Sequence, residues 1–458
     1  MKLTDLTRHQ LHFIGIGGSG MSGLARIALA MGIATSGSDA KKSAALDALT
    51  TLGAETYVGH SESNIKENQI VVVSSAIPAT NPELKKAQEL GLPILSRAKL
   101  LALFMENKRS IAVAGTHGKT TTTSALTVAL QSLGLDPSFA IGGTINRGGT
   151  NSHLGSGEYF VAEADESDGS FLEYRPFGAI ITNIELDHVD NFPTLEAIEG
   201  LFKDFISSIQ PGGFLVFCSD YPQIEALLKS AGRDDLTIVR YGINSNDLTF
   251  TNLSLQKTGS FARIIHRGKV LGELELSVPG EHNLLNALAV IGVAIALGLS
   301  PLEMMKGLRN FTGARRRFEI RGVAKEVTVI DDYGHHPTEI IATLKVARTF
   351  ARDGRVIAIF QPHRYSRTKE FINEFRNSLR LADKTYLLEV YGAGEDPIPG
   401  VSSALIAKDL DSATFNPSMV EVAQEVANFA QAGDVVITLG AGDVNALVPV
   451  IIENINAI

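Results

Sequence analysis

The sequence has little of what marks a secreted or a nucleic-acid-binding protein. Among 458 residues there are one cysteine, no tryptophan and a formal net charge of −9. A single cysteine, Cys218, can form neither an internal disulfide nor a cysteine-based zinc site, so we interpret it as a small buried hydrophobic residue. The acidic balance argues against nucleic acid as a partner, because domains that bind phosphate backbones are usually basic.

The sequence also has no segment that predicts export or a membrane span. The residues before the first expected strand contain no apolar stretch of the signal-peptide type. The most apolar later stretch, at 284–300, contains Asn286 and is shorter than the roughly 20 residues that a span needs. We interpret this stretch as a buried helix. We therefore expect a cytoplasmic protein that does not contact a membrane.

The length and the pattern of the chain predict several domains. At 458 residues the chain is too long for one ordinary core. Short apolar runs alternate with helical patterns in three successive stretches, which is typical of α/β domains with parallel sheets. Within the middle stretch, the alternation at 236–278 predicts a small β meander, and a helical stretch follows at 284–310. We predict three α/β domains, at 1–107, 108–312 and 313–458.

The segment GTHGKTTTT, residues 115–123, predicts a site for a nucleoside triphosphate. It follows a buried strand and opens a helix, where free amides and the helix dipole attract anions. Lys119 adds a full positive charge, and Thr120 offers a hydroxyl of the kind that binds the magnesium of a nucleoside triphosphate. Residue 113 is valine where the usual phosphate-binding loop has glycine. The segment is therefore a shorter variant, G-T-x-G-K-T.

Acidic side chains follow the next two expected strands of the middle stretch. Because strand C-terminal ends are where open α/β sheets place their sites, we expect these groups beside the phosphate loop. Oxygen ligands, with an imidazole among them, suit a hard divalent cation. A solvated acidic loop is the alternative interpretation. The residues are Glu163, Asp165, Glu166, Asp168, Asp187, His188 and Asp190.

The segment GIGGSG, residues 15–20, has the spacing of the dinucleotide fingerprint G-x-G-x-x-G. Asp39 follows at about the distance of a ribose-binding acid. Such a loop holds a pyrophosphate beside a ribose, and NAD and UDP-sugars share both groups. The second loop predicts the use of a triphosphate, so a nucleotide-linked substrate is favoured over NAD. An NAD-dependent oxidoreductase stays as an alternative that this fingerprint alone supports.

Eight segments, taken in order, resemble the motifs of the Mur ligase family. They are HFIGIGGSGMSGLA, AVAGTHGKTTTT, AEADESDGSF, NIELDHVD, PGEHNLLNA, GARRRFE, DDYGHHPTE and QPHRYSRT. The resemblance spans essentially the whole chain. It implies a Rossmann-like domain for a UDP-linked substrate, a central P-loop-type ATPase domain that contains the meander, and a C-terminal Rossmann-like domain that closes over ATP and substrate.

The resemblance also implies the reaction, which is amide formation driven by ATP through an acyl phosphate. Within the family, the motifs are most similar to those of the ligase that joins L-alanine to the lactyl carboxylate of UDP-N-acetylmuramate in peptidoglycan precursor synthesis. ATP and Mg²⁺, or Mn²⁺ in its place, are the implied cofactors. A recycling ligase that adds a whole tripeptide to the same UDP-sugar is the nearest alternative. A non-catalytic nucleotide sensor is a third.

The family's functional residues correspond to positions in all three expected domains. The implied catalytic residues are Lys119, Glu163, His188 and Arg317. The implied metal ligands are Thr120, Glu163 and His188. The implied ATP-binding residues are Gly115, Thr116, His117, Gly118, Lys119, Thr120, Thr121, Asn283, Asn286, Arg317 and Asp332. The implied substrate-binding residues are Gly17, Gly18, Ser19, Gly20, Met21, Ser22, Asp39, His60, Ser74, Tyr333, His335, His363, Arg364 and Arg367.

Several of these residues have ordinary structural alternatives. Asn283 and Asn286 lie three apart, where two amides on one helix face could read an adenine edge, but Asn283 could instead cap the helix. The three arginines at 315–317 could form a hinge patch between domains. His336 precedes a proline, and we interpret it as a residue that shapes the turn. Because the implied ATP contacts fall on both sides of residue 312, we expect a hinge near that point.

Overall fold

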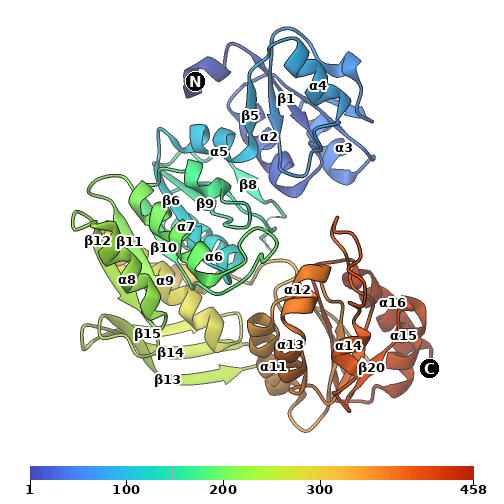
Figure 1. Cartoon of the computed structure of the whole chain (residues 1–458). Helices are drawn as coiled ribbons and strands as arrows, with labels where there is room; N and C mark the ends of the chain where they lie inside the picture. The colour runs from blue at the N-terminus through green and yellow to red at the C-terminus, as the bar shows by residue number, and fades with distance from the viewer. Residues whose placement is uncertain (146–148) are drawn as a thin grey trace.

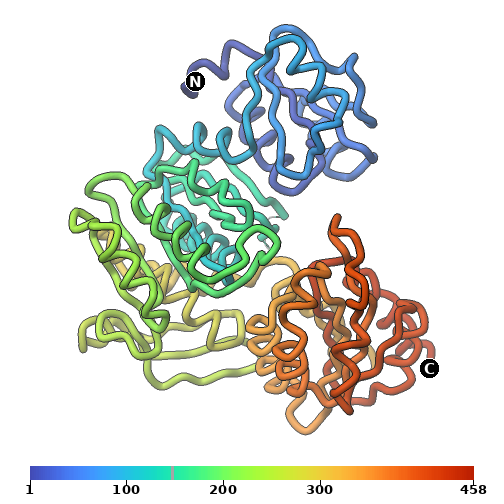
Figure 2. Tube along the Cα trace, in the orientation of Figure 1, coloured from blue at the N-terminus to red at the C-terminus, as the bar shows by residue number. Residues whose placement is uncertain are grey.

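The computed structural model describes residues 1–145 and 149–458, in which three α/β units follow one another along the chain (Figure 1). The tube in Figure 2 shows the N-terminal unit at the top, the middle unit below it and the C-terminal unit at the lower right. Each unit has its own sheet, of five, ten and six strands in turn. The predicted three-part α/β fold is confirmed. None of the helices in the described residues is both long and apolar enough to cross a membrane.

The N-terminal sheet is entirely parallel, in the order β3-β2-β1-β4-β5. Helices cover it on both faces, so its central strands are almost continuously buried. Asn81 caps α4, since its Oδ1 accepts from the amides of Glu83 and Leu84. The strands are β1 (Gln10–Ile14), β2 (Thr35–Asp39), β3 (Glu55–Val58), β4 (Gln69–Val73) and β5 (Ile94–Ser96). The helices are α1 (Leu3–Leu6), α2 (Ser19–Ala30), α3 (Ala44–Thr51), η1 (Glu62–Asn64), α4 (Pro82–Glu89) and α5 (Arg97–Met105).

The middle sheet has the order β15-β14-β13-β12-β11-β10-β6-β9-β7-β8. The predicted meander is shorter than expected, because β12 pairs in parallel with β11 and only β13 to β15 are antiparallel to one another. The strands are β6 (Arg109–Ala114), β7 (Ser138–Ala140), β8 (Ser152–His153), β9 (Tyr159–Glu163), β10 (Gly178–Ile181), β11 (Phe214–Cys218), β12 (Thr237–Tyr241), β13 (Leu248–Gln256), β14 (Gly259–His266) and β15 (Lys269–Leu276). Cys218 is buried, as expected.

The helical stretch predicted at 284–310 consists of two helices. The helices of the middle unit are α6 (Lys119–Ser132), η2 (Ser170–Glu173), α7 (Leu195–Ser208), α8 (Pro222–Ala231), α9 (Glu281–Leu297) and α10 (Pro301–Leu308). Gly298 ends α9 in the left-handed conformation, with φ of 71°. Ser300 then caps α10, and Pro301 occupies its first turn. The apolar α9 is buried along most of its length, as predicted.

The C-terminal sheet has the order β16-β17-β21-β18-β19-β20, with β16 as its antiparallel edge. The sequence pattern at 368–382 predicts one helix, but the structure breaks it at Phe371, whose φ of −107° and ψ of 24° are not helical. The strands are β16 (Glu319–Ala324), β17 (Val327–Asp332), β18 (Val356–Phe360), β19 (Lys384–Leu387), β20 (Ala413–Phe415) and β21 (Val435–Leu439). The helices are α11 (Pro337–Ala351), α12 (Tyr365–Glu370), α13 (Ile372–Leu379), α14 (Ala404–Ala407), α15 (Met419–Phe429), η3 (Val444–Ala446) and α16 (Leu447–Ala457).

The units are joined in two different ways. One hydrophobic cluster runs from the N-terminal unit into the middle unit, so that Phe104 of α5 and Phe171 of η2 belong to the same core. The C-terminal unit has separate clusters, and among the described residues of the middle unit only Leu186 and Val189 pack against one of them. Ion pairs such as Arg367 with Asp187 make up much of this second junction. We therefore expect the C-terminal unit to be the part that moves.

The hinge expected near residue 312 predicts a change in overall shape on ligand binding. We expect small-angle scattering to differ between the free protein and the protein saturated with a non-hydrolysable ATP analogue and UDP-N-acetylmuramate. The reason is that ligands touching two units favour one arrangement of those units. Superimposable scattering curves in the two states would contradict a hinge at this point.

Candidate active site

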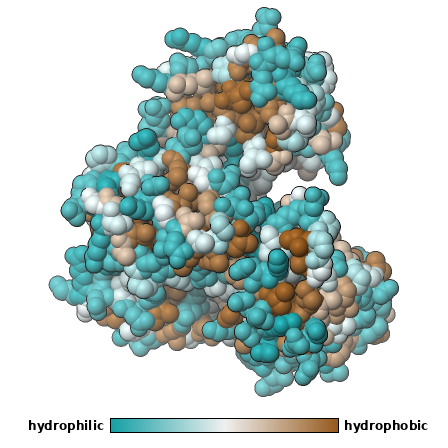
Figure 3. Space-filling view, in the orientation of Figure 1, coloured by the Kyte–Doolittle hydropathy of each residue, from teal (hydrophilic) through white to brown (hydrophobic). Residues whose placement is uncertain are grey.

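A cleft of about 690 Å³ lies where the three units meet. Figure 3 shows this face of the molecule hollowed between the N-terminal and C-terminal units. The cleft brings together the phosphate loop, the acidic strand ends and the arginine-rich segments that the sequence singled out. Its lining includes Ser19, Thr116, Gly118, Lys119, Thr120, Glu163, Asp165, His188, Arg317, Tyr333, His335, His363, Arg364 and Arg367.

The phosphate loop connects β6 to α6 and requires glycine at two positions. Gly115 has φ of 134°, and a Cβ there would lie 2.0 Å from Oγ1 of Thr182. Gly118 has φ of 80°, and a Cβ there would lie 2.7 Å from Oδ1 of Asn286. Few side chains adopt either conformation, and neither position has room for one. Neighbouring residues therefore fix the path of the loop before any ligand binds.

Lys119 folds back over the loop. Its Nζ donates to the carbonyl of Gly115 at 2.7 Å, to the carbonyl of Thr116 at 3.1 Å and to Oε1 of Glu166 at 2.9 Å. Burial alone would lower the pKa of Lys119, but the carboxylates of Glu166 and Asp165 raise it above its ordinary value. Burial raises the pKa of Glu166 to about 7, although Lys119 opposes this shift. Lys119 is thus a fixed positive charge at the phosphate loop.

Oxygen ligands and one imidazole gather at the ends of β9 and β10. Thr120 Oγ1 donates to Oε1 of Glu163 at 2.9 Å, which joins two of the expected metal ligands. His188, with φ of 51°, places its Nε2 3.7 Å from Oε1 of Glu166. One donor atom each of Asp165, Glu166 and His188 lies within 4.8 Å of the others. Burial lowers the pKa of His188, which favours the neutral, ligating form of the ring. These groups suit a hard divalent cation.

Two arginines of the C-terminal unit pair with the aspartates of the segment ELDHVD. Arg367 Nη2 lies 2.7 Å from Oδ1 of Asp187, and the Arg367 side chain is 3% exposed. Burial would raise the pKa of Asp187, but Arg367 holds it far below its ordinary value. Arg364 forms an ion pair with Asp190 and is 29% exposed. Arg364 is thus the more accessible of the two to a ligand in the cleft.

The rings of Tyr333, His335 and His363 form a row in the cleft. The ring centroids of Tyr333 and His335 are 5.4 Å apart, and those of His335 and His363 are 5.7 Å apart. Burial lowers the pKa of His335 to about 3 and that of His363 to about 4. Both rings are therefore neutral near pH 7, so they can form hydrogen bonds but cannot neutralise an anion.

A smaller pocket of about 160 Å³ adjoins the phosphate loop. Asn283 donates through Nδ2 to the carbonyl of Pro279 at 2.7 Å. The cap of α9 is Gly280, so the interpretation of Asn283 as a helix cap is wrong. The carboxylate of Asp332 accepts from the amides of Phe318 and Gly334, and burial raises its pKa to about 6. The pocket is lined by His117, Gly118, Thr121, Asn283, Asn286, Arg317 and Asp332, among others.

Within the run of three arginines at 315–317, Arg316 and Arg317 make different contacts. Arg316 donates to the carbonyl of Gly440 at 2.7 Å, which ties it to the C-terminal unit. Arg317 donates to Oε1 of Glu339 at 3.3 Å, and its guanidinium lies 5.1 Å from the ring centre of Tyr333. Arg317 lines both the cleft and the smaller pocket, so it alone of these two arginines can meet a ligand that spans them.

The first glycine loop connects β1 to α2 and faces the cleft through Ser19. Ser19 Oγ donates to the carbonyl of Gly142 at 3.0 Å, and the amide of Gly17 donates to Oδ2 of Asp39 at 3.0 Å. The side chains of Met21 and Ser22 are buried inside the unit. The remaining implied residues of this unit, Gly18, Gly20, His60 and Ser74, lie in the loops or helix start that follow β1, β3 and β4.

The sequence did not single out five residues that contribute to the site. Arg97 opens α5, and its guanidinium lies beside Gly20. The others are Asn183, Glu185, Thr338 and Glu339, which hold the phosphate loop against α11. Asn183 and Glu185 lie in the segment NIELDHVD, and Thr338 and Glu339 lie in DDYGHHPTE, where Glu339 follows His336 by three residues in a capping box. His336 shapes the start of α11, as predicted.

Three family models match the chain in succession. They are described as Mur ligase family, catalytic domain, at residues 10–109; Mur ligase middle domain, at 113–294; and Mur ligase, glutamate ligase domain, at 316–442. Each match falls on one of the three units described above.

Full-length relatives decide the family. A protein of Acidothermus cellulolyticus named UDP-N-acetylmuramate–L-alanine ligase is 46% identical over 96% of this chain and 94% of its own length. The chain belongs to the Mur ligase family. A protein of the same name from Renibacterium salmoninarum is 48% identical to this Mur ligase over 97% of the chain and 95% of its own length.

Solved structures resemble this Mur ligase over nearly its full length. The UDP-N-acetylmuramate-alanine ligase MurC of Thermotoga maritima matches with a TM-score of 0.82 and 30% identity, over 98% of this chain and 99% of that chain. A murein peptide ligase of Psychrobacter arcticus matches with a TM-score of 0.73 and 27% identity, over the same shares. The resemblance to the family stated from the motifs is therefore confirmed.

The geometry of the phosphate loop predicts that Gly115→Ala abolishes turnover and lowers thermal stability. The added methyl group would lie 2.0 Å from Oγ1 of Thr182, at a φ that alanine rarely adopts. Gly200→Ala, in α7, is the matched control, because a Cβ there meets nothing within 4 Å. We expect this control to keep its activity and to gain up to about 1 kcal/mol of stability. Thermal denaturation measures the stability of the two variants, and ATP-dependent phosphate release measures their activity. An active Gly115→Ala protein would contradict the requirement for glycine at position 115.

Proposed function

We propose that the protein uses ATP to join L-alanine to the lactyl carboxylate of UDP-N-acetylmuramate, through an acyl phosphate, in peptidoglycan precursor synthesis. The observation that carries the proposal is the cleft itself, where the lysine-bearing loop, the acidic strand ends and the first glycine loop meet. The full-length relatives with that printed name support it. The proposed domains are 1–107 for the UDP-substrate, 108–312 for ATP and 313–458 for closure over both. Cytoplasmic location stays a prediction.

The first chemical step brings a carboxylate onto a polyanion, so catalysis requires charge neutralisation and alignment. Lys119 is proposed to sit at the β- and γ-phosphates, where its fixed charge offsets the charge of the triphosphate. Thr120 and Glu163 would hold a first divalent cation, and His188 would help to hold a second. Bound Mg²⁺, or Mn²⁺ in its place, would supply positive charge at the phosphate oxygens. The donor set of oxygens and a neutral imidazole supports this assignment.

The C-terminal unit is proposed to align the acceptor. Arg317, which lies between the two cavities, would contact the γ-phosphate. Arg364 is the better candidate for bidentate binding of the muramoyl carboxylate, because Arg367 is buried against Asp187. Tyr333, His335 and His363 would contact the muramoyl end through hydrogen bonds. Arg367 would then act mainly by holding Asp187 beside His188.

The smaller pocket is proposed to hold the nucleoside of ATP. Asn286 would read the adenine edge, together with the part of the Asn283 amide that its bond to Pro279 leaves available. Asp332 would accept from the ribose hydroxyls, in addition to the two amides that already bind it. The adjoining loop residues, Gly115 to Thr121, would surround the phosphates. Asp39, His60 and Ser74 would contact the UDP part of the other substrate.

Three alternatives are weaker. The murein peptide ligase of Psychrobacter arcticus covers the chain equally well but has a lower TM-score than the Thermotoga enzyme, 0.73 against 0.82. The relatives at 46% and 48% identity carry the name of the alanine ligase. Membership of the Mur ligase family argues against an NAD-dependent oxidoreductase. A non-catalytic sensor is disfavoured because Lys119, Thr120 and Glu163 are all present, with Lys119 bound to Glu166 and Thr120 bound to Glu163.

The amino-acid substrate is tested by phosphate release from ATP in the presence of UDP-N-acetylmuramate. L-alanine, L-serine, glycine and the tripeptide are supplied separately, and mass spectrometry identifies the product. We expect the highest kcat/KM with L-alanine and a product with one added alanine residue. Preferential turnover of the tripeptide would show that the protein catalyses the recycling reaction instead. Phosphate release that does not depend on the UDP-sugar would contradict both the alanine-ligase and the tripeptide-ligase reactions.

The role of Lys119 is tested by Lys119→Ala. We expect kcat to fall by about 100- to 1,000-fold, the usual effect of losing one group that stabilises developing charge. Because the lysine also binds two loop carbonyls, circular dichroism and thermal denaturation must accompany the kinetics. Calorimetry should show Mg²⁺-dependent ATP binding in the unmodified protein. Unchanged turnover in a folded Lys119→Ala protein would contradict this assignment.

A further inference from the structure

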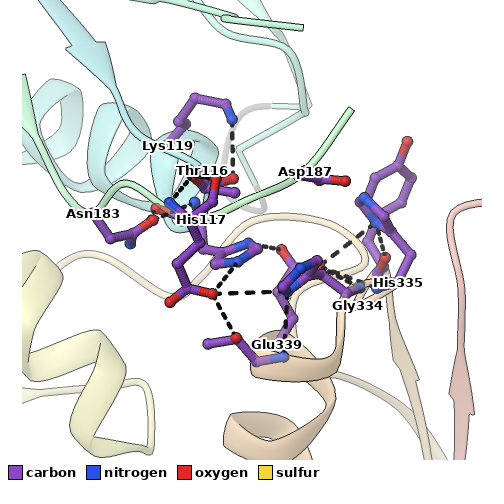
Figure 4. Close-up of polar contacts among 12 residues, drawn as sticks. Thr116, His117, Lys119, Asn183, Asp187, Gly334, His335 and Glu339 are labelled. Carbon is purple, nitrogen blue, oxygen red and sulfur yellow. Dashed lines mark hydrogen bonds and ion pairs between the residues drawn. The ribbon is translucent and has the colours of Figure 1, made fainter. Parts of the chain in front are cut away.

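A cluster of polar side chains connects the phosphate loop to the C-terminal unit. This junction cluster consists of His117, Glu185, His336, Thr338 and Glu339. Figure 4 shows the His117 ring between the phosphate loop and the start of α11, on the side of the loop away from the Lys119 ammonium group. The mechanism proposed above gives the other four residues of the cluster no task, although three of them come from the unit that is expected to move.

The His117 ring lies between two carboxylates that belong to different units. Its Nε2 is 3.3 Å from Oε2 of Glu185, and its Nδ1 is 3.5 Å from Oε1 of Glu339. A neutral imidazole carries one N–H and could donate to only one of them, whereas an imidazolium donates to both. Burial would lower the pKa of His117, but the two glutamates raise it to about 9. The ring is therefore a cation that bridges the units.

Glu339 joins this cation to Arg317. Its Oε2 accepts from the amides of His335 and His336, at 3.0 and 3.3 Å, so the start of α11 fixes the carboxylate. Its Oε1 faces His117 and accepts from Nη1 of Arg317 at 3.3 Å. The side chain of Glu339 is 12% exposed, which limits screening by water. One carboxylate oxygen therefore sets the distance between the phosphate loop and the arginine proposed to contact the γ-phosphate.

Glu185 makes the second connection to α11. Its Oε2 accepts from the Thr338 hydroxyl at 2.6 Å, and its Oε1 accepts from the Tyr221 hydroxyl at 3.2 Å. Next to it, Nε2 of His336 lies 3.3 Å from the carbonyl of Leu186. The start of α11 is therefore attached to the middle unit on both sides of His117. The two attachments restrict rotation of the C-terminal unit at this point.

A metal ion is a poor alternative explanation for the cluster. His117, Glu185 and His336 each offer a ligand atom within 4.8 Å of the others. The two histidine rings, however, face one another with centroids 4.6 Å apart and planes at 38°. Nδ1 of His336 already accepts from the amide of Thr338 as part of the helix cap. These contacts satisfy the ring atoms by hydrogen bonding, which leaves no common point for an ion.

We propose that Glu339 and Glu185 are positioning residues, which hold the His117 imidazolium and thereby fix Arg317 and the C-terminal unit against the phosphate loop. The proposal rests on the proposed function, because it assigns Arg317 to the transferred phosphate. Neither glutamate touches a substrate in this scheme. They act by placing groups that do, so their loss reduces the rate of the chemical step more than it weakens ATP binding.

Glu339→Gln tests the proposal while keeping the size of the side chain. Its amide oxygen can still accept from the amides of His335 and His336, but the charge that faces His117 and Arg317 is lost. We expect kcat to fall by about 10- to 100-fold, the usual effect of removing an outer-shell partner, with KM for ATP changed less than about threefold. Glu421→Gln is the matched control, because Glu421 occupies the same third position of a capped helix, α15, away from the junction. Equal kcat in the two variants would overturn the proposal.

A double-mutant cycle distinguishes positioning from a general structural effect. If Glu339 acts through His117, then Glu339→Gln should lower kcat much less in a His117→Gln background than in the unmodified protein. Non-additivity is expected because the two residues share one interaction. Fully additive losses of kcat would overturn the proposal, even where each single variant is impaired and folded.

A distance measurement tests the junction without any assay of turnover. Spin labels at Val270→Cys on β15 and Val420→Cys on α15 report on the middle and C-terminal units, since these side chains are 60% and 77% exposed. We expect a narrow distance distribution with Mg²⁺ and an ATP analogue, and a broader one after Glu339→Gln. A distance distribution that is unchanged by Glu339→Gln would overturn the proposed role of the junction cluster. Failure of the amino-acid assay with a normal distance response would instead count against the proposed substrate alone.

Discussion

Charge pairing within and around the cleft is the constraint on which the rest of this structure depends. Four cations of the cleft each face a carboxylate: Lys119 with Glu166, Arg317 with Glu339, Arg364 with Asp190 and Arg367 with Asp187. A buried charge without a partner costs several kcal/mol, so these pairs allow the site to exist before ligands bind. A triphosphate can then replace the carboxylates around cations that are already in place, which limits the reorganisation that accompanies catalysis.

The pairs also explain why the units are joined unequally. Apolar packing continues from the N-terminal unit into the middle unit through α5 and η2, and such contacts are lost together or not at all. The C-terminal unit is attached mainly through ion pairs and hydrogen bonds, which water and ligand anions can replace one at a time. A ligand that carries several negative charges therefore acts on the second junction far more than on the first.

Local patterns predicted the elements and the main motifs, but not the partners across units. The strand, glycine turn and helix around Lys119 follow from neighbours in sequence, as does the cap at Asn81. A helix break was missed at Phe371, where continuous apolar periodicity outweighed weaker signals for an end. Glu185 and Glu339 lie 154 positions apart in the sequence. No rule based on sequence spacing could therefore predict that both contact His117. The orientation of Met21 likewise depended on packing inside the unit.

The two glycine loops differ in the way their proposed roles require. Both open a helix and so offer backbone amides to an anion. In the first loop, Asp39 accepts from the amide of Gly17, and the loop itself carries no lysine. A carboxylate suits ribose hydroxyls, and the cation beside this loop is Arg97, which comes from α5. In the second loop, Lys119 adds a full charge. During transfer the phosphoryl group keeps negative charge on its equatorial oxygens, and the leaving diphosphate gains negative charge as its bond breaks, so this loop needs a fixed cation of its own.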